Sequence, residues 1–146
     1  MHRELSKALL AEEVAVGNRG RLRTRLPSDL VLEDATVFVT VTNATDAPLH
    51  VLALTGENYN AEPLHLAAVH PKTRELLSED AWPAGLRFGS PHPVHQRPFC
   101  CLRGLADYYT HPSHLQERWD RDRPGRRLEV VVGHLLDRMG VPACAI

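Results

Sequence analysis

Three short segments with the composition of β-strands follow one another between residues 36 and 69, and they restrict the fold more than any other feature. The first, TVFVTVT at 36–42, alternates strictly and is β-branched or aromatic throughout, as half-buried strands are. LHVLALT at 49–55 and LHLAAV at 64–69 follow after short turn-rich connections. Because a parallel pair needs a crossover of about a dozen residues or more, these strands are predicted to form an antiparallel meander.

Helical patterns flank the strands at both ends of the chain. Residues 3–16 repeat apolar side chains at helical spacing beside charged ones, and Gly17-Asn18 predict the end of this helix. Residues 127–140, RLEVVVGHLLDRMG, show the i, i+3, i+4, i+7 pattern and end at a glycine. The VVV run inside this second segment also fits a strand.

These patterns predict an α+β fold, in which an antiparallel β-meander is flanked by N-terminal and C-terminal helices. We expect a single domain over residues 1–146, with its core in about 30–140, and a short fourth strand at 86–88, LRF. The alternating valines of the first strand should share the core with the apolar face of the last helix. The residues concerned are Val37, Val39, Val41, Leu135 and Leu136.

Four arginines alternate over residues 19–25, RGRLRTR. In an extended chain this spacing places all four on one face. We interpret the segment as a charged edge strand, and the alternative is a docking patch for an acidic partner.

The charge and hydropathy of the chain exclude two classes of partner. With 17 basic and 18 acidic residues the net charge is -1, which gives no overall field for nucleic acid. No apolar run approaches the ~20 residues that span a bilayer. The N-terminal residues lack the pattern of a signal peptide, so we expect a cytoplasmic protein with protein partners.

Residues 91–118, PHPVHQRPFCCLRGLADYYTHPSHLQER, concentrate the side chains that bind metals. This stretch holds four of the nine histidines and two of the three cysteines, namely His92, His95, His111, His114, Cys100 and Cys101. An odd number of cysteines, two of them adjacent, does not indicate a disulfide framework, so free, metal-bound or catalytic thiols are expected. Imidazole nitrogen and thiolate sulfur are preferred ligands of zinc.

The spacing within this stretch predicts three zinc ligands, Cys101, His111 and His114. Thr110 is expected to cap a helix that places both histidines on one face. Adjacent cysteines in an extended chain point to opposite sides, so Cys100 is an alternative to Cys101. The candidates for a fourth ligand are Glu62, Glu117, His92 and His95.

Two other functions are compatible with the same residues. Arg97 and Arg103 could lower the pKa of the Cys101 thiol, which would then carry an acyl group as a thioester without any metal. The third alternative is a protein-interaction module that binds no metal.

Three segments of the sequence resemble the bacterial family described as a predicted metal-binding CEHH domain. They are YNAEPLHL, HPVHQRPFCCLRGL and YYTHPSHLQERW. Members of that family occur in operons for ubiquitin-like conjugation, and the resemblance covers about residues 36–139. It implies a metal set of Glu62, Cys101, His111 and His114, and protein partners from a ubiquitin-like modification system. The family name places Cys before Glu, and this order keeps Glu117 as an alternative to Glu62.

The order of the predicted elements is also similar to that of ubiquitin-conjugating enzymes. In that family a His-Pro-Asn turn precedes the catalytic cysteine by under a dozen residues, and His92-Pro93 stands at a similar interval before Cys101. The resemblance implies a ubiquitin-conjugating-enzyme-like fold with Cys101 as acyl carrier. Val94 replaces the asparagine that stabilises the oxyanion in that family, and this replacement favours metal binding over acyl transfer.

Overall fold

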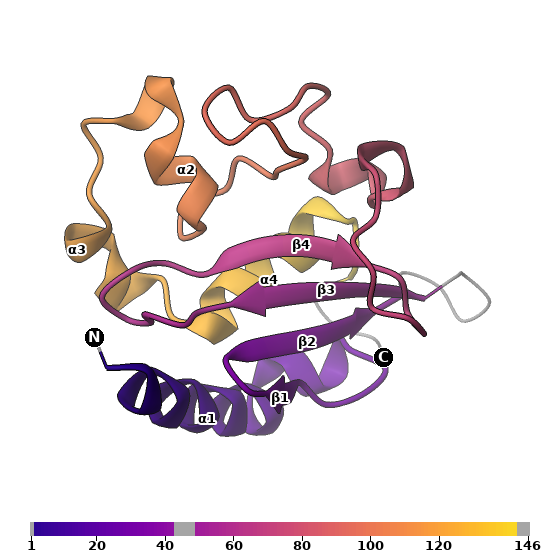
Figure 1. Cartoon of the computed structure of the whole chain (residues 1–146). Helices are drawn as coiled ribbons and strands as arrows, with labels where there is room; N and C mark the ends of the chain where they lie inside the picture. Colours follow the sequence, from indigo (N-terminus) through magenta and orange to yellow (C-terminus); the bar gives the residue numbers. More distant parts are fainter. Residues whose placement is uncertain (1, 43–48, 143–146) are drawn as a thin grey trace.

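The sheet that the sequence predicts is present in the computed structural model of the chain, which describes residues 2–42 and 49–142 (Figure 1). Its strands are β1 (Val31–Glu33), β2 (Thr36–Val41), β3 (His50–Thr55) and β4 (His65–Val69), in the order β1-β2-β3-β4. All three neighbouring pairs are antiparallel, which confirms the α+β meander. Residues 43–48, where the sequence predicts a turn between β2 and β3, lie outside the described residues.

The fourth strand is not where the sequence predicts it. Residues 84–86 form a 3-10 turn, η3 (Ala84–Leu86), and the fourth strand is β1, which pairs with β2 from Val31↔Phe38 to Glu33↔Thr36. Asp34 closes this hairpin with φ at 56°, a backbone conformation that aspartate tolerates better than most residues. β1 has three residues, too few to show a periodic pattern.

One face of the sheet carries the hydrophobic core. Val37, Val39 and Val41 are fully buried and belong to the same apolar cluster as Leu135 and Leu136, as expected. Two long helices, α1 (Arg3–Arg19) and α4 (Leu128–Arg138), supply the other side of this core. The C-terminal helix is therefore confirmed, and the strand alternative for its VVV run is wrong.

The N-terminal helix continues past its predicted end at Gly17-Asn18. Gly17 is buried inside the helix, where an added Cβ would lie 2.9 Å from the Leu30 side chain. The Asn18 amide then joins the helix to the start of the sheet, because its Nδ2 donates to the Leu30 carbonyl at 3.1 Å and its Oδ1 accepts from the Leu30 N–H at 2.7 Å. These contacts explain why Gly17-Asn18 does not stop the helix.

The alternating arginines do not form an extended edge strand. They turn back after α1 in the 3-10 helix η1 (Arg21–Thr24), because Leu22 packs into the core. Arg25 folds against α4, where it bonds to the Asp137 carboxylate at 2.8 Å and to the Gly133 carbonyl at 3.3 Å. A guanidinium used in this way is structural.

Between β4 and α4 the chain is largely irregular, and much of this segment, including α2, lies beyond the β4 edge of the sheet (Figure 1). It contains 3-10 turns and two short helices: η2 (Glu79–Ala81), η3, α2 (Ala106–Thr110), η4 (Pro112–His114), α3 (Trp119–Asp122) and η5 (Arg123–Gly125). The N–H of Ala106 donates to the carbonyl of Leu64 at 2.8 Å, which attaches α2 to the start of β4.

The predicted helix cap at Thr110 is wrong. Thr110 is the last residue of α2, and His111 instead caps η4, because its Nδ1 accepts the N–H of Ser113 at 3.2 Å. None of the helices within the described residues has the length and apolar character needed to cross a bilayer.

Candidate metal centre

The His-Pro segment forms a tight loop that is organised by one buried imidazole. His92 is 0% exposed, and its Nδ1 accepts the N–H groups of Val94 and His95, both at 3.1 Å. Because Nδ1 accepts, the neutral ring carries its proton on Nε2, which lies 3.0 Å from the carbonyl oxygen of Asp107. His92 therefore joins the loop to the first turn of α2.

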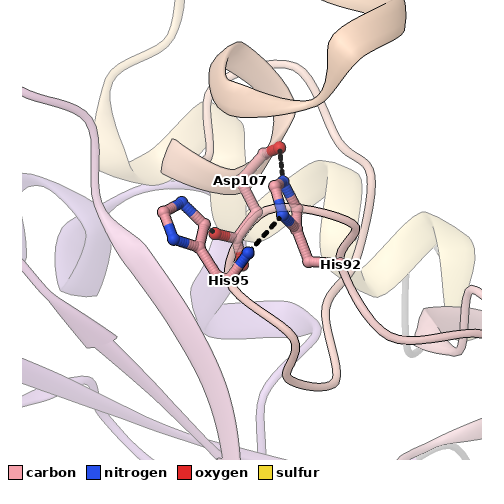
Figure 2. A group of neighbouring side chains, drawn as sticks. All are labelled: His92, His95 and Asp107. Atoms are coloured by element: carbon pink, nitrogen blue, oxygen red, sulfur yellow. Dashed lines mark hydrogen bonds and ion pairs between the residues drawn. The ribbon is translucent and has the colours of Figure 1, made fainter.

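Three side chains from this loop and α2 form the candidate metal centre (Figure 2). Each of His92, His95 and Asp107 offers one ligand atom, and these atoms all lie within 4.8 Å of one another. His95 Nε2 is 4.0 Å from Asp107 Oδ1. Among the residues that the structure describes, this is the one group of at least three histidines, cysteines or acidic residues with that property. Imidazole and carboxylate are ligands of zinc and similar divalent metals.

The Asp107 carboxylate is only 5% exposed, and it also binds Arg97. Arg97 Nη2 donates to Asp107 Oδ1 at 2.7 Å, whereas the Arg97 side chain as a whole is 43% exposed. A buried carboxylate requires such a partner. A metal ion would supply the same compensation, so the guanidinium and a metal compete for one oxygen.

The four histidines of the stretch form a continuous row of ring contacts. The centroid distances are 4.7 Å from His95 to His92, 5.8 Å from His92 to His111 and 5.9 Å from His111 to His114. The row ends at Tyr108, on which His114 stacks at 3.9 Å. The fold therefore unites the two His pairs that are separated in sequence.

His114 is oriented by a carboxylate. Its Nδ1 lies 2.8 Å from Glu117 Oε2, which also accepts the Tyr108 hydroxyl at 2.6 Å, and Arg103 pairs with the other oxygen. The hydrogen bond from Tyr108 is the main cause that lowers the pKa of Glu117. A carboxylate on Nδ1 leaves Nε2 of His114 with its lone pair free, as in histidines prepared for metal binding.

The two central cysteines differ in environment. Cys100 is 3% exposed and belongs to the core, and this burial raises the pKa of its thiol to about 11. Cys101 is half-buried, and its pKa is raised first by burial and then by the negative charges of Asp107 and Glu117, against the effect of Arg138. Both thiols are therefore protonated near neutral pH when no metal is bound, contrary to the lowered pKa expected for an acyl carrier.

Two members of the set implied by the family resemblance, His111 and His114, lie with their ring centroids 5.9 Å apart. Glu62 is exposed in the loop after β3, where it lines a hollow with Thr55 and Pro63. In the described part of the chain, the predicted set does not form a group with ligand atoms within 4.8 Å, so this set stays a prediction. Asp107 was missed, because it lies on a helix of five residues whose sequence, ADYYT, shows no ligand spacing. His92 and His95 had been considered as additional ligands.

Neither the protein-family models nor the curated proteins include a match to this chain.

Proposed function

We propose that the protein binds a divalent metal ion, zinc, at His92, His95 and Asp107. The observation that carries this proposal is the convergence of two imidazoles and one buried carboxylate within 4.8 Å of one another. A buried carboxylate is costly unless a cation compensates it, and a metal ion would serve in the same way as Arg97. The competing site would be the set that the family resemblance implies, Glu62, Cys101, His111 and His114.

Small movements would bring the ligands to zinc. Ligand atoms at about 2.0–2.2 Å from zinc in a tetrahedron lie roughly 3.3–3.5 Å apart, so the 4.0 Å between His95 and Asp107 must shorten by about 0.5 Å. Arg97 must release Asp107 Oδ1 or move to the other oxygen. At His92, zinc would bind the Nε2 lone pair only after the ring proton has moved to Nδ1. The bonds that Nδ1 accepts from Val94 and His95 and the bond to the Asp107 carbonyl would then be given up, without net release of a proton.

The test is metal analysis of protein purified without a histidine tag, followed by titration against a chromophoric chelator. We expect about one zinc per chain. Loss of a residue that only supports a metal ligand weakens metal binding by roughly 10- to 100-fold. His95→Gln and Asp107→Asn each remove a ligand, so each should weaken zinc binding by more than this. Arg97→Gln should strengthen it, because the competing cation is gone. His134→Gln on α4 is the matched control and should change nothing.

Two results would contradict this assignment. Folded protein that was never exposed to a chelator and holds no stoichiometric metal would end the proposal of metal binding. Loss of zinc in Cys101→Ser combined with His114→Ala, together with normal binding in His95→Gln, would move the site to the set that the sequence resemblance implies.

We further propose that the protein is an accessory component of a bacterial ubiquitin-like modification system. The support is the resemblance of the FCCLRG and THPSH segments to the CEHH family, together with the order of helix, meander, His-Pro turn, cysteine and helices that ubiquitin-conjugating enzymes share. Calorimetric titration of the ubiquitin-like protein of such a system into the purified chain tests it. A chain that binds neither this protein nor its activating enzyme is not an accessory of that system.

A second candidate is acyl transfer through Cys101, favoured by its partial exposure and by the rigid turn at His92-Pro93. The acyl group of the modifier would pass from the activating enzyme's thiol to the Cys101 sulfur, and the proton would pass the other way. An adduct that thiols cleave and that Cys101→Ser lacks, formed with activating enzyme and ATP, would favour this function. Slow alkylation of Cys101 that accelerates with chelator would instead favour metal binding at the competing set that includes Cys101.

A further inference from the structure

The outer edge of β4 is occupied at both ends and free between them. The Ala68 carbonyl accepts the N–H of Leu77 at 3.0 Å, and the Leu64 carbonyl accepts the N–H of Ala106 at 2.8 Å. Backbone groups that point to one edge of a strand come from every second residue, so those of Leu66 point the same way. Among the described residues, no hydrogen bond on this edge reaches Leu66.

A cavity of about 280 Å³ lies along this free edge. Its walls are mainly apolar and include Leu66, Ala68, Leu76, Leu77, Trp82 and Pro98. Leu76 is 77% exposed, which is unusual for a leucine and leaves an open apolar rim. The volume is at the lower limit of small-molecule sites, so it suits a single residue better than a cofactor.

Arg97 lines the same cavity and supplies a positive charge. A guanidinium has five N–H donors, and the bond to Asp107 uses only Nη2. The other donors of this half-exposed side chain are available to a carboxylate, for which arginine has the matching planar geometry. The cavity is therefore surrounded by apolar side chains, by the free N–H and C=O of Leu66, and by the guanidinium of Arg97.

We propose that the cavity and the free β4 edge beside it, which together we call the slot, bind the C-terminus of a peptide whose last residue is apolar. The peptide backbone pairs with the N–H and C=O of Leu66, its last side chain fills the apolar hollow, and its terminal carboxylate binds Arg97. Only about 13 Å separates Leu64 from Ala68 along the strand, so the bridged ends exclude a long added strand and admit a chain end. This binding mode needs no metal ion, but it shares Arg97 with the candidate metal centre.

The experiment uses the full chain labelled with ¹⁵N and treated with chelator, and the probe peptide Gly-Ser-Gly-Ser-Val-Leu with a fluorescent label at its N-terminus. We expect saturable binding by fluorescence anisotropy, with a shifted amide signal of Leu66 and slower hydrogen exchange there. The same peptide with a C-terminal amide should bind about tenfold more weakly or worse, because it lacks the bond between charged groups.

Two variants separate the slot from other surfaces. Arg97→Gln and Leu76→Asp should each weaken the peptide by about tenfold or more, whereas Leu5→Asp, a change of the same kind on α1, should not. Leu76 is so exposed that its variant folds even if Arg97→Gln does not. No saturable binding, equal binding of acid and amide peptides, or binding that leaves the Leu66 signal unmoved would each overturn the proposal. Because zinc is excluded, a failed metal proposal leaves this result intact.

Discussion

The buried carboxylate of Glu13 offers the most stringent test of the fold. One oxygen, Oε1, accepts the Tyr59 hydroxyl at 2.9 Å and the N–H of Leu128 at 2.9 Å, and it thereby joins α1, the loop after β3 and the start of α4. Arg127, the residue at the N-cap of α4, provides no side-chain cap of its own. Glu13 therefore acts as a cap supplied from another helix.

The cost of removing this carboxylate follows from the groups that it leaves behind. Tyr59 is 1% exposed and Leu128 0%, so neither donor can turn to water in Glu13→Ala. Each unpaired buried donor costs about 1–3 kcal/mol, which gives roughly 4 kcal/mol for the two. Glu13→Gln keeps an acceptor oxygen and should cost only about 1 kcal/mol, because a neutral acceptor binds about half as strongly.

Urea denaturation measures the free energies of unfolding of Glu13→Ala and Glu13→Gln. The same measurement is made on Tyr59→Phe and on the double variant Glu13→Ala/Tyr59→Phe. Glu13→Ala should cost about 1–3 kcal/mol less in the Tyr59→Phe background, where one donor is already gone. Hydrogen exchange at the Leu128 amide should accelerate in Glu13→Ala. Equal stabilities of the Ala and Gln variants, or simple additivity with Tyr59→Phe, would refute the bridging role.

The remaining predictions concern the core and its packing. Burial raises the pKa of Cys100 from its ordinary value of 9.0 to about 11, so the unfolded state loses the proton first and stability falls as pH rises. Relative to Cys100→Ala, the parent should lose about 1.3 kcal/mol between about pH 8 and pH 10, and parallel pH profiles of unfolding would contradict this. Gly85→Ala should lower the free energy of unfolding by more than about 2 kcal/mol, because its Cβ would lie 1.8 Å from the Arg138 carbonyl oxygen. Gly125→Ala is the control in thermal melts, because a Cβ there has no neighbour within 4 Å. Val39→Asp places an unpaired charge in the core and should abolish the cooperative melting transition; a variant that melts like the parent would show that Val39 does not face this core.

The parts of the fold that sequence could predict are those with local periodicity. β2 follows from alternating β-branched residues, and β3 and β4 follow from short apolar runs between turn-rich connections. The packing of the β2 valines in one core with Leu135 and Leu136 follows from two independent amphipathic patterns. β1 could not be found in this way, because three residues carry no period and the strand depends on the turn at Asp34. Arg25 was misassigned because its partner Asp137 is 112 residues away in the chain.

In the candidate site, too, the sequence predicted what is local in the chain and missed what depends on tertiary contacts. Clustering of histidines in one stretch correctly indicated where ligand atoms gather, because a short loop keeps His92 and His95 together. Asp107 joins them only because α2 packs beside that loop, and its burial is a property of the tertiary structure. Residue spacing contains no information about such a contact.

The two borders of the sheet also affect how the molecule behaves at high concentration. β1 ends the sheet with only three residues and a charged Glu33, which Arg74 binds at 2.6 Å. On the opposite side, bridges from Leu64 to Leu105 and from Val69 to Leu76 use the chain's own backbone to occupy the ends of β4. A sheet with one short, charged border and one border interrupted by its own loop gives a second copy no long row of backbone groups to extend. The fold therefore protects itself from growing into fibrils, although within the described residues the outward N–H and C=O of Leu66 stay unpaired at the β4 border.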